Sequence, residues 1–203
     1  KKGQSYSRVE NMNVDAYTSQ VIKDYTEGDY STICNYSQWL ANCTSEGMES
    51  TLEQVVRFGV RPEHVDDYAK RTQAVLDIID AANIHDTPLS RFERIRDSVA
   101  FTEGDTFSWG VRSVSTDMTL TEKVAKGLDG GLEWIQDEDN PFKYREFIIE
   151  GSKKSVDISS ISPYDQAEHL IKGDFEVVKV EKHVEVADTK LYRDLITIRQ
   201  VFK

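Results

Sequence analysis

The sequence predicts an α+β domain, with helices in its first part and a β-sandwich or paired sheets in its second. Before His85, apolar side chains recur every three or four positions, which is the spacing of one helical face. After Pro88, the chain changes to short runs of β-branched and aromatic residues, which are typical of strands. A length of 203 residues suits one compact core. We therefore expect a single domain over 1–203, with a helical part at about 10–85 and a mixed β core at about 88–203.

Four short helices are expected in the first part. Turn-forming residues separate them at Gly28-Asp29, at Ser45-Glu46-Gly47 and between Gly59 and Pro62. Each helix would bury one apolar stripe, and the stripes are Val14, Tyr17, Val21, Ile22 and Tyr25; Ile33, Tyr36 and Leu40; Met48, Leu52, Val55 and Val56; and Tyr68, Val75, Leu76 and Ile79.

Five strands are expected in the second part, at 91–96, 107–114, 144–149, 175–180 and 191–202. The segment between Met118 and Asn140 interrupts them. It predicts a short helix around 121–125, followed by a glycine-rich and acidic loop from Asp129. Helices first and strands afterwards is the element order of an α+β fold.

The composition narrows the range of partners. Lysine and arginine number 25 against 36 aspartate and glutamate residues, which gives a formal charge of −11. An acidic surface repels the phosphates of nucleic acids, so a protein target is favoured over RNA or DNA. No apolar run is long enough for a membrane span and the first residues contain no signal-peptide core, so we expect a soluble chain without a membrane partner.

Cysteine and histidine give no sign of a metal site. Cys34 and Cys43 are too few for a disulfide framework or a four-ligand zinc site, so we expect reduced structural thiols. The histidines are scattered without metal-ligand spacing and are expected at the surface or in loops; they are His64, His85, His169 and His183.

The first of three clusters with chemical potential is Ile95-Arg96-Asp97, at the end of a predicted strand. Alternation along that strand puts Phe92, Arg94 and Arg96 on one face. A guanidinium donates two parallel hydrogen bonds to paired oxygens and so suits a pyrophosphate. A solvated strand edge is the commoner role of a lone arginine.

The second cluster is the segment 110–117, which runs Gly-Val-Arg-Ser-Val-Ser-Thr-Asp. Strand alternation points Ser113 and Ser115 the same way, and Asp117 is placed to cap the helix that follows. Two hydroxyls on one face can brace a carboxylate or a ribose. The alternative is an ordinary polar strand face that runs into a helix cap.

The third cluster runs from Ser159 to Glu168 and precedes the Gly173-Asp174 turn. Gln166 and Glu168 are two residues apart at the start of a predicted strand, so both side chains would face one way, next to Tyr164. A fixed carboxylate stabilises the positive charge that builds up when a glycosidic bond breaks. An amide offers a donor and an acceptor to an incoming group. The alternative is a solvent-facing strand start.

In this order, the three clusters resemble the arginine, Ser-x-Ser and x-x-Glu signature of mono-ADP-ribosyltransferases of the toxin and phage type. The second cluster meets that family's pattern residue for residue: glycine, apolar, any, serine, small, serine, any, aspartate. The resemblance extends over most of the chain. It includes Asp24-Tyr25-Thr26 with Tyr30 and Ile33-Cys34-Asn35 among the helices, and the run 175–180 among the strands.

The resemblance implies two sheets packed across each other around an NAD⁺ cleft, with the N-terminal helices along one side. It also implies an enzyme with NAD⁺ as co-substrate, which cleaves the nicotinamide–ribose bond and transfers ADP-ribose to a macromolecule. The resemblance implies that Glu168, Gln166 and Ser113 are catalytic, with Ser113 orienting the carboxylate of Glu168. It implies NAD⁺ binding by Arg96, which would hold the phosphates, by Ser113, and by Ser115 on the nicotinamide side. Gln166 and Tyr164 would recognise the target. The acidic loop from about Asp129 to Phe142 lies where the family has its phosphate-nicotinamide loop, with Trp134 and Phe142 as stacking partners.

The sequence departs from the family at two places. The family usually has an aromatic residue before the motif arginine, whereas Ile95 precedes Arg96, so Arg94 and Arg91 are alternative phosphate ligands. Arginine-modifying relatives carry glutamate at the position of Gln166. A neutral amide cannot deprotonate a guanidinium, so Gln166 predicts another acceptor, such as an asparagine, threonine or glutamine side chain or a guanine base, unless it replaces a native glutamate.

Two other functions stay open on the sequence. One is an NAD⁺ glycohydrolase, in which water accepts the ribose, and the other is a binding module that keeps the fold without catalysis. For a transferase, the resemblance implies a host protein as partner. It places the activity in the cytoplasm of an infected or intoxicated cell, reached by secretion or by phage delivery.

Overall fold

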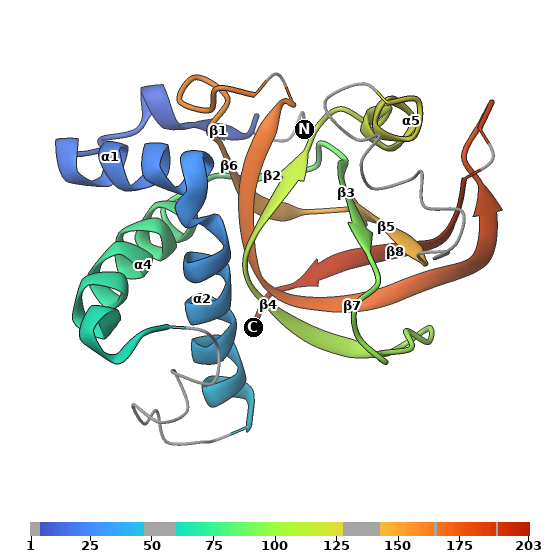
Figure 1. The fold of residues 1–203 in the computed structure, drawn as a ribbon, viewed down its shortest axis with the longest axis horizontal. Helices are drawn as coiled ribbons and strands as arrows, with labels where there is room; N and C mark the ends of the chain where they lie inside the picture. Colours follow the sequence, from blue (N-terminus) through green and yellow to red (C-terminus); the bar gives the residue numbers. More distant parts are fainter. Residues whose placement is uncertain (1–4, 47–59, 128–142, 165, 190) are drawn as a thin grey trace.

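The computed structural model describes residues 5–46, 60–127, 143–164, 166–189 and 191–203. Three helices, α1 (Ala16–Asp24), α2 (Tyr30–Glu46) and α4 (Val65–Asp80), lie on one side of the molecule, and most of the strands lie on the other side together with α5 (Leu120–Ala125) (Figure 1). A 3-10 turn at Pro62–His64 leads into α4. The short helix α5 follows the strand β4 (Thr106–Ser115).

Local chemistry explains where α1 begins and how it continues. Asp15 precedes α1, and its side chain accepts a hydrogen bond from the backbone N–H of Thr18 at 2.7 Å. The turn predicted at Gly28-Asp29 is a kink: a π-helical turn, Tyr25–Asp29, joins α1 to α2, and the backbone of Gly28 within it is not helical. Of the four expected helices, the one around Met48 to Val56 lies outside the described residues.

The strands of the β part are β3 (Leu89–Arg94), β4 (Thr106–Ser115), β5 (Tyr144–Glu150), β6 (Lys153–Asp157), β7 (Glu168–Glu185) and β8 (Tyr192–Val201). Two short strands, β1 (Ser7–Arg8) and β2 (Ile84–His85), pair with β6. The remaining order is β6-β7-β4-β3-β5-β8. Because β8 also pairs with β7, the last five strands of this order form a closed ring.

The long strand β7 joins the two halves of the sheet. Its first part pairs with β6 and β4, and its second part, from Asp174, pairs with β8. In Figure 1 it curves along the whole β part. The predicted α+β class, with N-terminal helices packed on the β part, is therefore confirmed, and the two expected sheets are continuous because β7 pairs in both of them.

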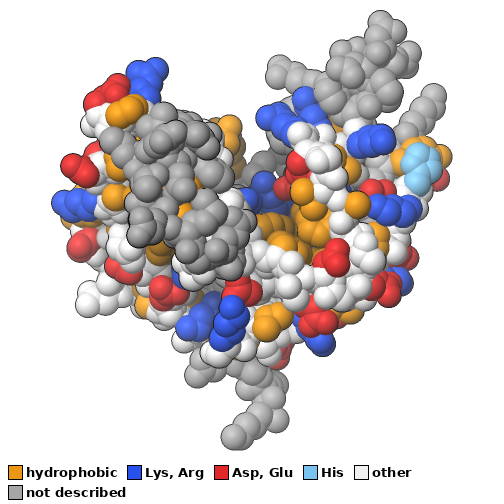
Figure 2. Space-filling view, turned by 90° about the horizontal axis from the view of Figure 1, so that it is seen from below, with side chains coloured by type: hydrophobic (Ala, Val, Ile, Leu, Met, Phe, Trp, Pro, Cys, Tyr) orange, Lys and Arg blue, Asp and Glu red, His pale blue; other side chains and the backbone are white. Residues whose placement is uncertain are grey.

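Two hydrophobic cores lie on opposite faces of this sheet. The first fills the space between the helices and the face of β4, β6 and β7 that carries Val111, Val156 and Leu170. The second fills the inside of the ring, where Trp109, Phe147, Phe175 and other apolar side chains pack. Alternation in β7 explains the division, since Leu170 belongs to the first core and Ile171 to the second. Seen from below, the surface is indented between the helical part and the strands, and hydrophobic and basic side chains lie in the indentation (Figure 2).

The strand β6 is absent from the sequence-based prediction. Its first residues, Lys153, Lys154 and Ser155, resemble an exposed loop. Lys153 is nevertheless fully buried, because its ammonium group donates hydrogen bonds to the carbonyl oxygens of Thr87, at 2.8 Å, and of Gly151. Burial lowers the pKa of Lys153 to about 8. The lysine therefore made β6 look exposed in the sequence, although the strand is buried.

The expectation of surface histidines is wrong for His85 and His169. Both are about 1% exposed, and the hydroxyl of Ser155 lies between their rings, 2.7 Å from Nε2 of His85 and 2.9 Å from Nδ1 of His169. The ring of Tyr6 packs edge-on against both imidazoles. Burial lowers the pKa of each histidine to about 4, so both are neutral in the folded protein at pH 7.

These two histidines predict a loss of stability in acid. In the unfolded chain a histidine has a pKa of about 6.5, so between that pH and about pH 4 the unfolded state binds more protons. The free energy of unfolding should therefore fall as the pH drops through this window, by on the order of 2 kcal/mol for each histidine. Urea unfolding at pH 7, 6, 5 and 4.5 measures this slope. His85→Gln should make the slope shallower, and the exposed His64→Gln should leave it unchanged; equal slopes in all three proteins would contradict the assignment.

Candidate active site

The end of β4 and the start of β7 form the centre of the candidate site. Ser115 stands opposite Glu168 in the antiparallel register, so the two share a face of the sheet with Ser113. The hydroxyl of Ser113 donates a hydrogen bond to Oε2 of Glu168 at 3.2 Å. The hydroxyl of Ser162 donates to Oε1 at the same distance. Both oxygens of this carboxylate are thus held by neutral hydroxyls.

Glu168 is buried in a way that changes its acidity. Its side chain is 8% exposed. Burial raises the pKa of Glu168 above its usual range, and the hydrogen bonds from Ser162 and Ser113 partly oppose that rise. Neutral donors fix the position of the carboxylate without neutralising its charge, so the ionised form can stabilise a cation that develops next to it.

Ser115 holds the loop that precedes Glu168. Its hydroxyl donates to the carbonyl oxygen of Gln166 and accepts from the backbone N–H of Asp117 at 2.9 Å. Between Gln166 and Glu168, Ala167 has a φ of 47°, a left-handed conformation that is uncommon for alanine. Residues held in such conformations concentrate at functional sites.

The loop before Glu168 differs from the predicted strand start, in which alternation would have put Gln166 and Glu168 on one face. The strand β7 begins at Glu168, and the left-handed Ala167 breaks the alternation before it. Gln166 nevertheless lines the same pocket as Glu168. The two residues are therefore brought to one pocket by the turn at Ala167 and not by strand alternation. Tyr164, on the same loop, is exposed.

The three candidate arginines occupy different places. Arg96 lies beyond the end of β3 and is exposed. Arg94 is the last residue of the strand and is partly buried. Arg91 lines the pocket next to Glu168, where its Nη1 donates to the carbonyl oxygen of Ser113 at 2.9 Å and its Nε donates to Glu93 at 3.0 Å. Of the three, Arg91 is the one that the structure brings to the site.

The pocket itself has a volume of about 160 Å³. Its polar side is formed by Arg91, Ser113, Gln166 and Glu168, and its apolar side includes Phe92, Leu120 and Val124. A second guanidinium, that of Arg112, lies between β4 and α2 and donates to Oε1 of Gln38 at 2.6 Å. Burial, followed by the nearby charge of Arg91, lowers the pKa of Arg112. Arg91 and Arg112 are therefore near enough to affect each other, and Arg91 is the guanidinium that lines the pocket with Glu168.

One member of the site was not among the site residues that the sequence predicted. Tyr25, on the helical side, places its hydroxyl 2.8 Å from that of Ser113 and 3.4 Å from Sγ of Cys34. In the sequence it forms part of an apolar stripe, and nothing in its local spacing separates a core tyrosine from one that reaches a strand residue 88 positions away. The acidic loop from Asp129 to Phe142, including Trp134, lies outside the described residues.

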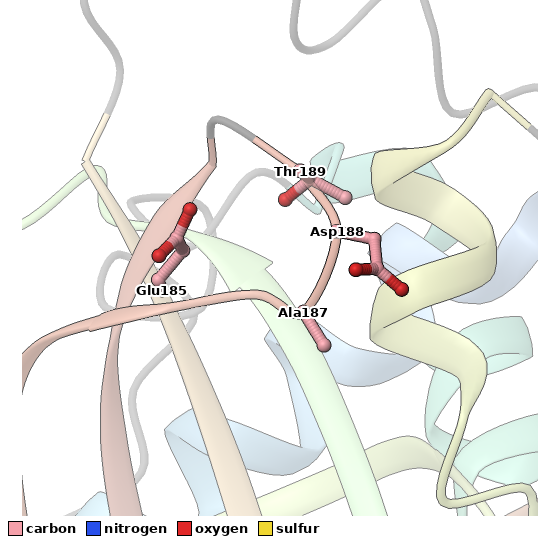
Figure 3. Close-up of a pocket in the computed structure, with 4 residues that line it drawn as sticks. All are labelled: Glu185, Ala187, Asp188 and Thr189. Carbon is pink, nitrogen blue, oxygen red and sulfur yellow. The ribbon is translucent and has the colours of Figure 1, made fainter.

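A second hollow, of about 520 Å³, lies at the turn between β7 and β8 (Figure 3). It is lined by Glu185, Ala187, Asp188 and Thr189. The charged residues in the described part of this lining are two carboxylates, which do not favour a diphosphate. Among the residues that the structure describes, no group of three or more histidine, cysteine, aspartate or glutamate side chains is arranged to hold a metal ion. Within the same described residues, no helix is long and apolar enough to cross a membrane.

Comparison with known proteins gives a match at the level of structure only. No protein-family model matches the sequence, and no curated protein matches it either. The ADP-ribosyltransferase Vis of Vibrio splendidus, in complex with agmatine, is similar, with a TM-score of 0.61, 16% identity, and 94% of this chain and 76% of that chain covered. Plx2a, an ADP-ribosyltransferase toxin from Paenibacillus larvae, has a TM-score of 0.54, 13% identity, and coverage of 93% and 88%.

A third similar structure is an ADP-ribosyltransferase from Clostridium botulinum, with a TM-score of 0.53, 13% identity, and coverage of 94% and 90%. All three matches extend over nearly the whole of this chain, so the likeness includes both the helices and the sheet. The chain therefore has the fold of the bacterial ADP-ribosyltransferase toxins.

Proposed function

We propose that this protein is a mono-ADP-ribosyltransferase, which cleaves the nicotinamide–ribose bond of NAD⁺ and transfers ADP-ribose to a protein. The observation that carries the proposal is the buried Glu168, held by Ser113 and Ser162 in the same pocket as Arg91. The fold supports it, because the similar structures are ADP-ribosyltransferases.

Glu168 supplies the central chemistry of the proposed reaction. As the bond between ribose C1′ and the nicotinamide nitrogen breaks, its electron pair leaves with neutral nicotinamide and positive charge develops on the ribose. The ionised Glu168 stabilises that charge. A nucleophile of the acceptor then forms a new bond to C1′ and releases its proton to solvent water. Ser113 and Ser162 keep the carboxylate in place throughout.

We assign phosphate binding to Arg91 in preference to Arg96. The Nε–H and one Nη of Arg91 are used within the protein, on Glu93 and Ser113, which fixes the plane of the guanidinium and leaves its other N–H groups for a ligand. Arg96 lies outside β3 and is exposed, and within the described part of the chain no hydrogen bond fixes its guanidinium.

Arg91→Gln should raise KM for NAD⁺ by about 10- to 100-fold, the loss expected for one charged hydrogen-bonding partner. Arg96→Gln is the matched control, because it removes the same group from an exposed position. Initial rates of nicotinamide release over a range of NAD⁺ concentrations measure both. If Arg96→Gln raises KM and Arg91→Gln does not, the assignment is wrong.

Gln166 and Tyr164 are proposed to meet the acceptor. Gln166 lines the pocket, and Tyr164 is exposed at its loop. Since the amide of Gln166 cannot remove a proton from a guanidinium, we propose an acceptor other than arginine on a host protein, in the cytoplasm of the host cell. Vis, by contrast, has been captured with agmatine, which is a guanidinium compound.

The test combines two measurements. The protein is incubated with NAD⁺ labelled in the adenylate and with a host lysate, and nicotinamide release and labelled macromolecules are followed together. The proposal predicts labelled proteins, no labelled agmatine, and a gain of agmatine labelling in Gln166→Glu. Nicotinamide release without any labelled macromolecule would instead identify an NAD⁺ glycohydrolase. Absence of both, in a folded protein, would identify a binding module.

A further inference from the structure

The helical part of the molecule reaches the catalytic carboxylate through Tyr25. This residue opens the π-helical turn between α1 and α2 and is 1% exposed. Its ring belongs to the core between the helices and the sheet, and its hydroxyl leaves that core to contact Ser113 at 2.8 Å and Cys34 at 3.4 Å.

The directions of these hydrogen bonds follow from the carboxylate. An ionised Glu168 can only accept, so the single proton of Ser113 points to Oε2 of Glu168. The oxygen of Ser113 must then accept from Tyr25, whose one proton is thereby used. The thiol of Cys34 can only donate to the oxygen of Tyr25. The result is a one-way chain from Cys34 through Tyr25 and Ser113 to Glu168.

We propose that Tyr25 is a positioning residue, which acts through Ser113 to hold the hydroxyl proton on Glu168, and that Cys34 sets the direction of the Tyr25 hydroxyl. Without Tyr25, the Ser113 hydroxyl is free to rotate away from the carboxylate. With Tyr25, each bond in the chain polarises the next, so the last donor is strengthened. This role deepens the proposed transferase function and rests on it.

The surroundings suit a permanent donor. Burial, and next the neighbouring Cys34, raise the pKa of Tyr25 well above its usual range, so the phenol keeps its proton at neutral pH. A serine or water in its place would lack the rigid aromatic ring that is packed among Ile22, Ile33 and Val111. The hydroxyl is thus fixed from the core side.

Tyr25→Phe tests the proposal, since it deletes the hydroxyl and keeps the ring. The matched control is Tyr36→Phe, at a tyrosine of α2 that is 7% exposed and packs with Trp39 in a separate cluster. In Tyr25→Phe, kcat for nicotinamide release should fall about tenfold, the loss expected for one net hydrogen bond. KM for NAD⁺ should stay the same, and the acid limb of the kcat profile should move to higher pH. Tyr36→Phe should leave all three unchanged.

A second readout does not depend on turnover. A carbon NMR titration of the Glu168 carboxyl should give a higher pKa in Tyr25→Phe than in the parent and in Tyr36→Phe, since the carboxylate loses support. Cys34→Ser keeps a hydrogen-bond donor and should leave the titration of Glu168 as in the parent. Cys34→Ala should shift the titration in the same direction as Tyr25→Phe. An active parent with an unchanged titration and unchanged kcat in Tyr25→Phe would overturn the role of Tyr25 and leave the transferase proposal standing. If the parent is inactive and the Glu168 titration still shifts in Tyr25→Phe, the transferase proposal is overturned and the positioning role of Tyr25 stands.

Discussion

Glu168→Gln should lower the rate of nicotinamide release by about 10²- to 10³-fold, the range found when one group that stabilises transition-state charge is removed. Glutamine has nearly the shape of glutamate, and its amide can still bond to the hydroxyls of Ser113 and Ser162, which now hold the carboxylate. The lost property is the negative charge next to the ribose. KM for NAD⁺ should change much less than kcat, because Arg91 and the pocket walls remain.

The same substitution should not weaken the fold. The pKa of Glu168 is raised in the folded protein, so its ionised form is less favourable there than in the unfolded chain. Its charge therefore lowers stability at pH 7, and that penalty disappears as the pH falls below the unfolded pKa of about 4.3. Glu168→Gln should therefore be more stable than the parent at pH 7, and the difference should shrink towards pH 4. The exposed Glu63→Gln is the control; a variant that is both inactive and strongly destabilised would show that Glu168 is structural.

Gly110→Ala should destabilise the protein by roughly 3–5 kcal/mol, from overpacking and the loss of two hydrogen bonds. A methyl group at this position would overlap the backbone of Ser37 and Gln38 in α2. Two hydrogen bonds join the same segments, from the N–H of Gly110 to Gln38 at 3.0 Å and from the N–H of Val111 to the hydroxyl of Ser37 at 2.8 Å. Any shift that makes room for the methyl group breaks them.

Urea unfolding at pH 7 measures this loss. Gly28→Ala is the matched control, because a methyl group there meets nothing within 4 Å. It should change the free energy of unfolding by less than about 1 kcal/mol. A similar midpoint for Gly110→Ala and the parent would mean that α2 does not pack against β4 as closely as described. The glycine that opens the Gly-x-x-Ser-x-Ser motif is thus explained by the close approach of a helix.

The fold class was predictable because both periodicities are strong in the sequence. Helical spacing at Val21, Ile22 and Tyr25 and strand texture around 107–114 correspond to α1 and β4. The strand β6 was not predictable. Lys153 is buried because the backbone carbonyl groups of Thr87 and Gly151 accept hydrogen bonds from its ammonium group. Partners of that kind come from the folded chain and leave no trace in local spacing.

The candidate site likewise has features that the sequence predicted and features that only the structure reveals. Alternation within β4 places Ser113 and Ser115 on one face, and the structure has both hydroxyls on the side of Glu168. The choice between Arg91 and Arg96 needed the end of β3, which the sequence predicted two residues too late. The contact between Tyr25 and Ser113 joins two distant segments, so only the packed structure reveals it.

The most direct test of the central claim is the release of nicotinamide from NAD⁺ by the purified, folded protein, measured together with ADP-ribose bound to an acceptor protein. The claim predicts that nicotinamide appears and that ADP-ribose is found on the acceptor in matching amounts. It also predicts that both signals disappear in Glu168→Gln. Intact NAD⁺ after incubation with the parent protein and every acceptor fraction would contradict it.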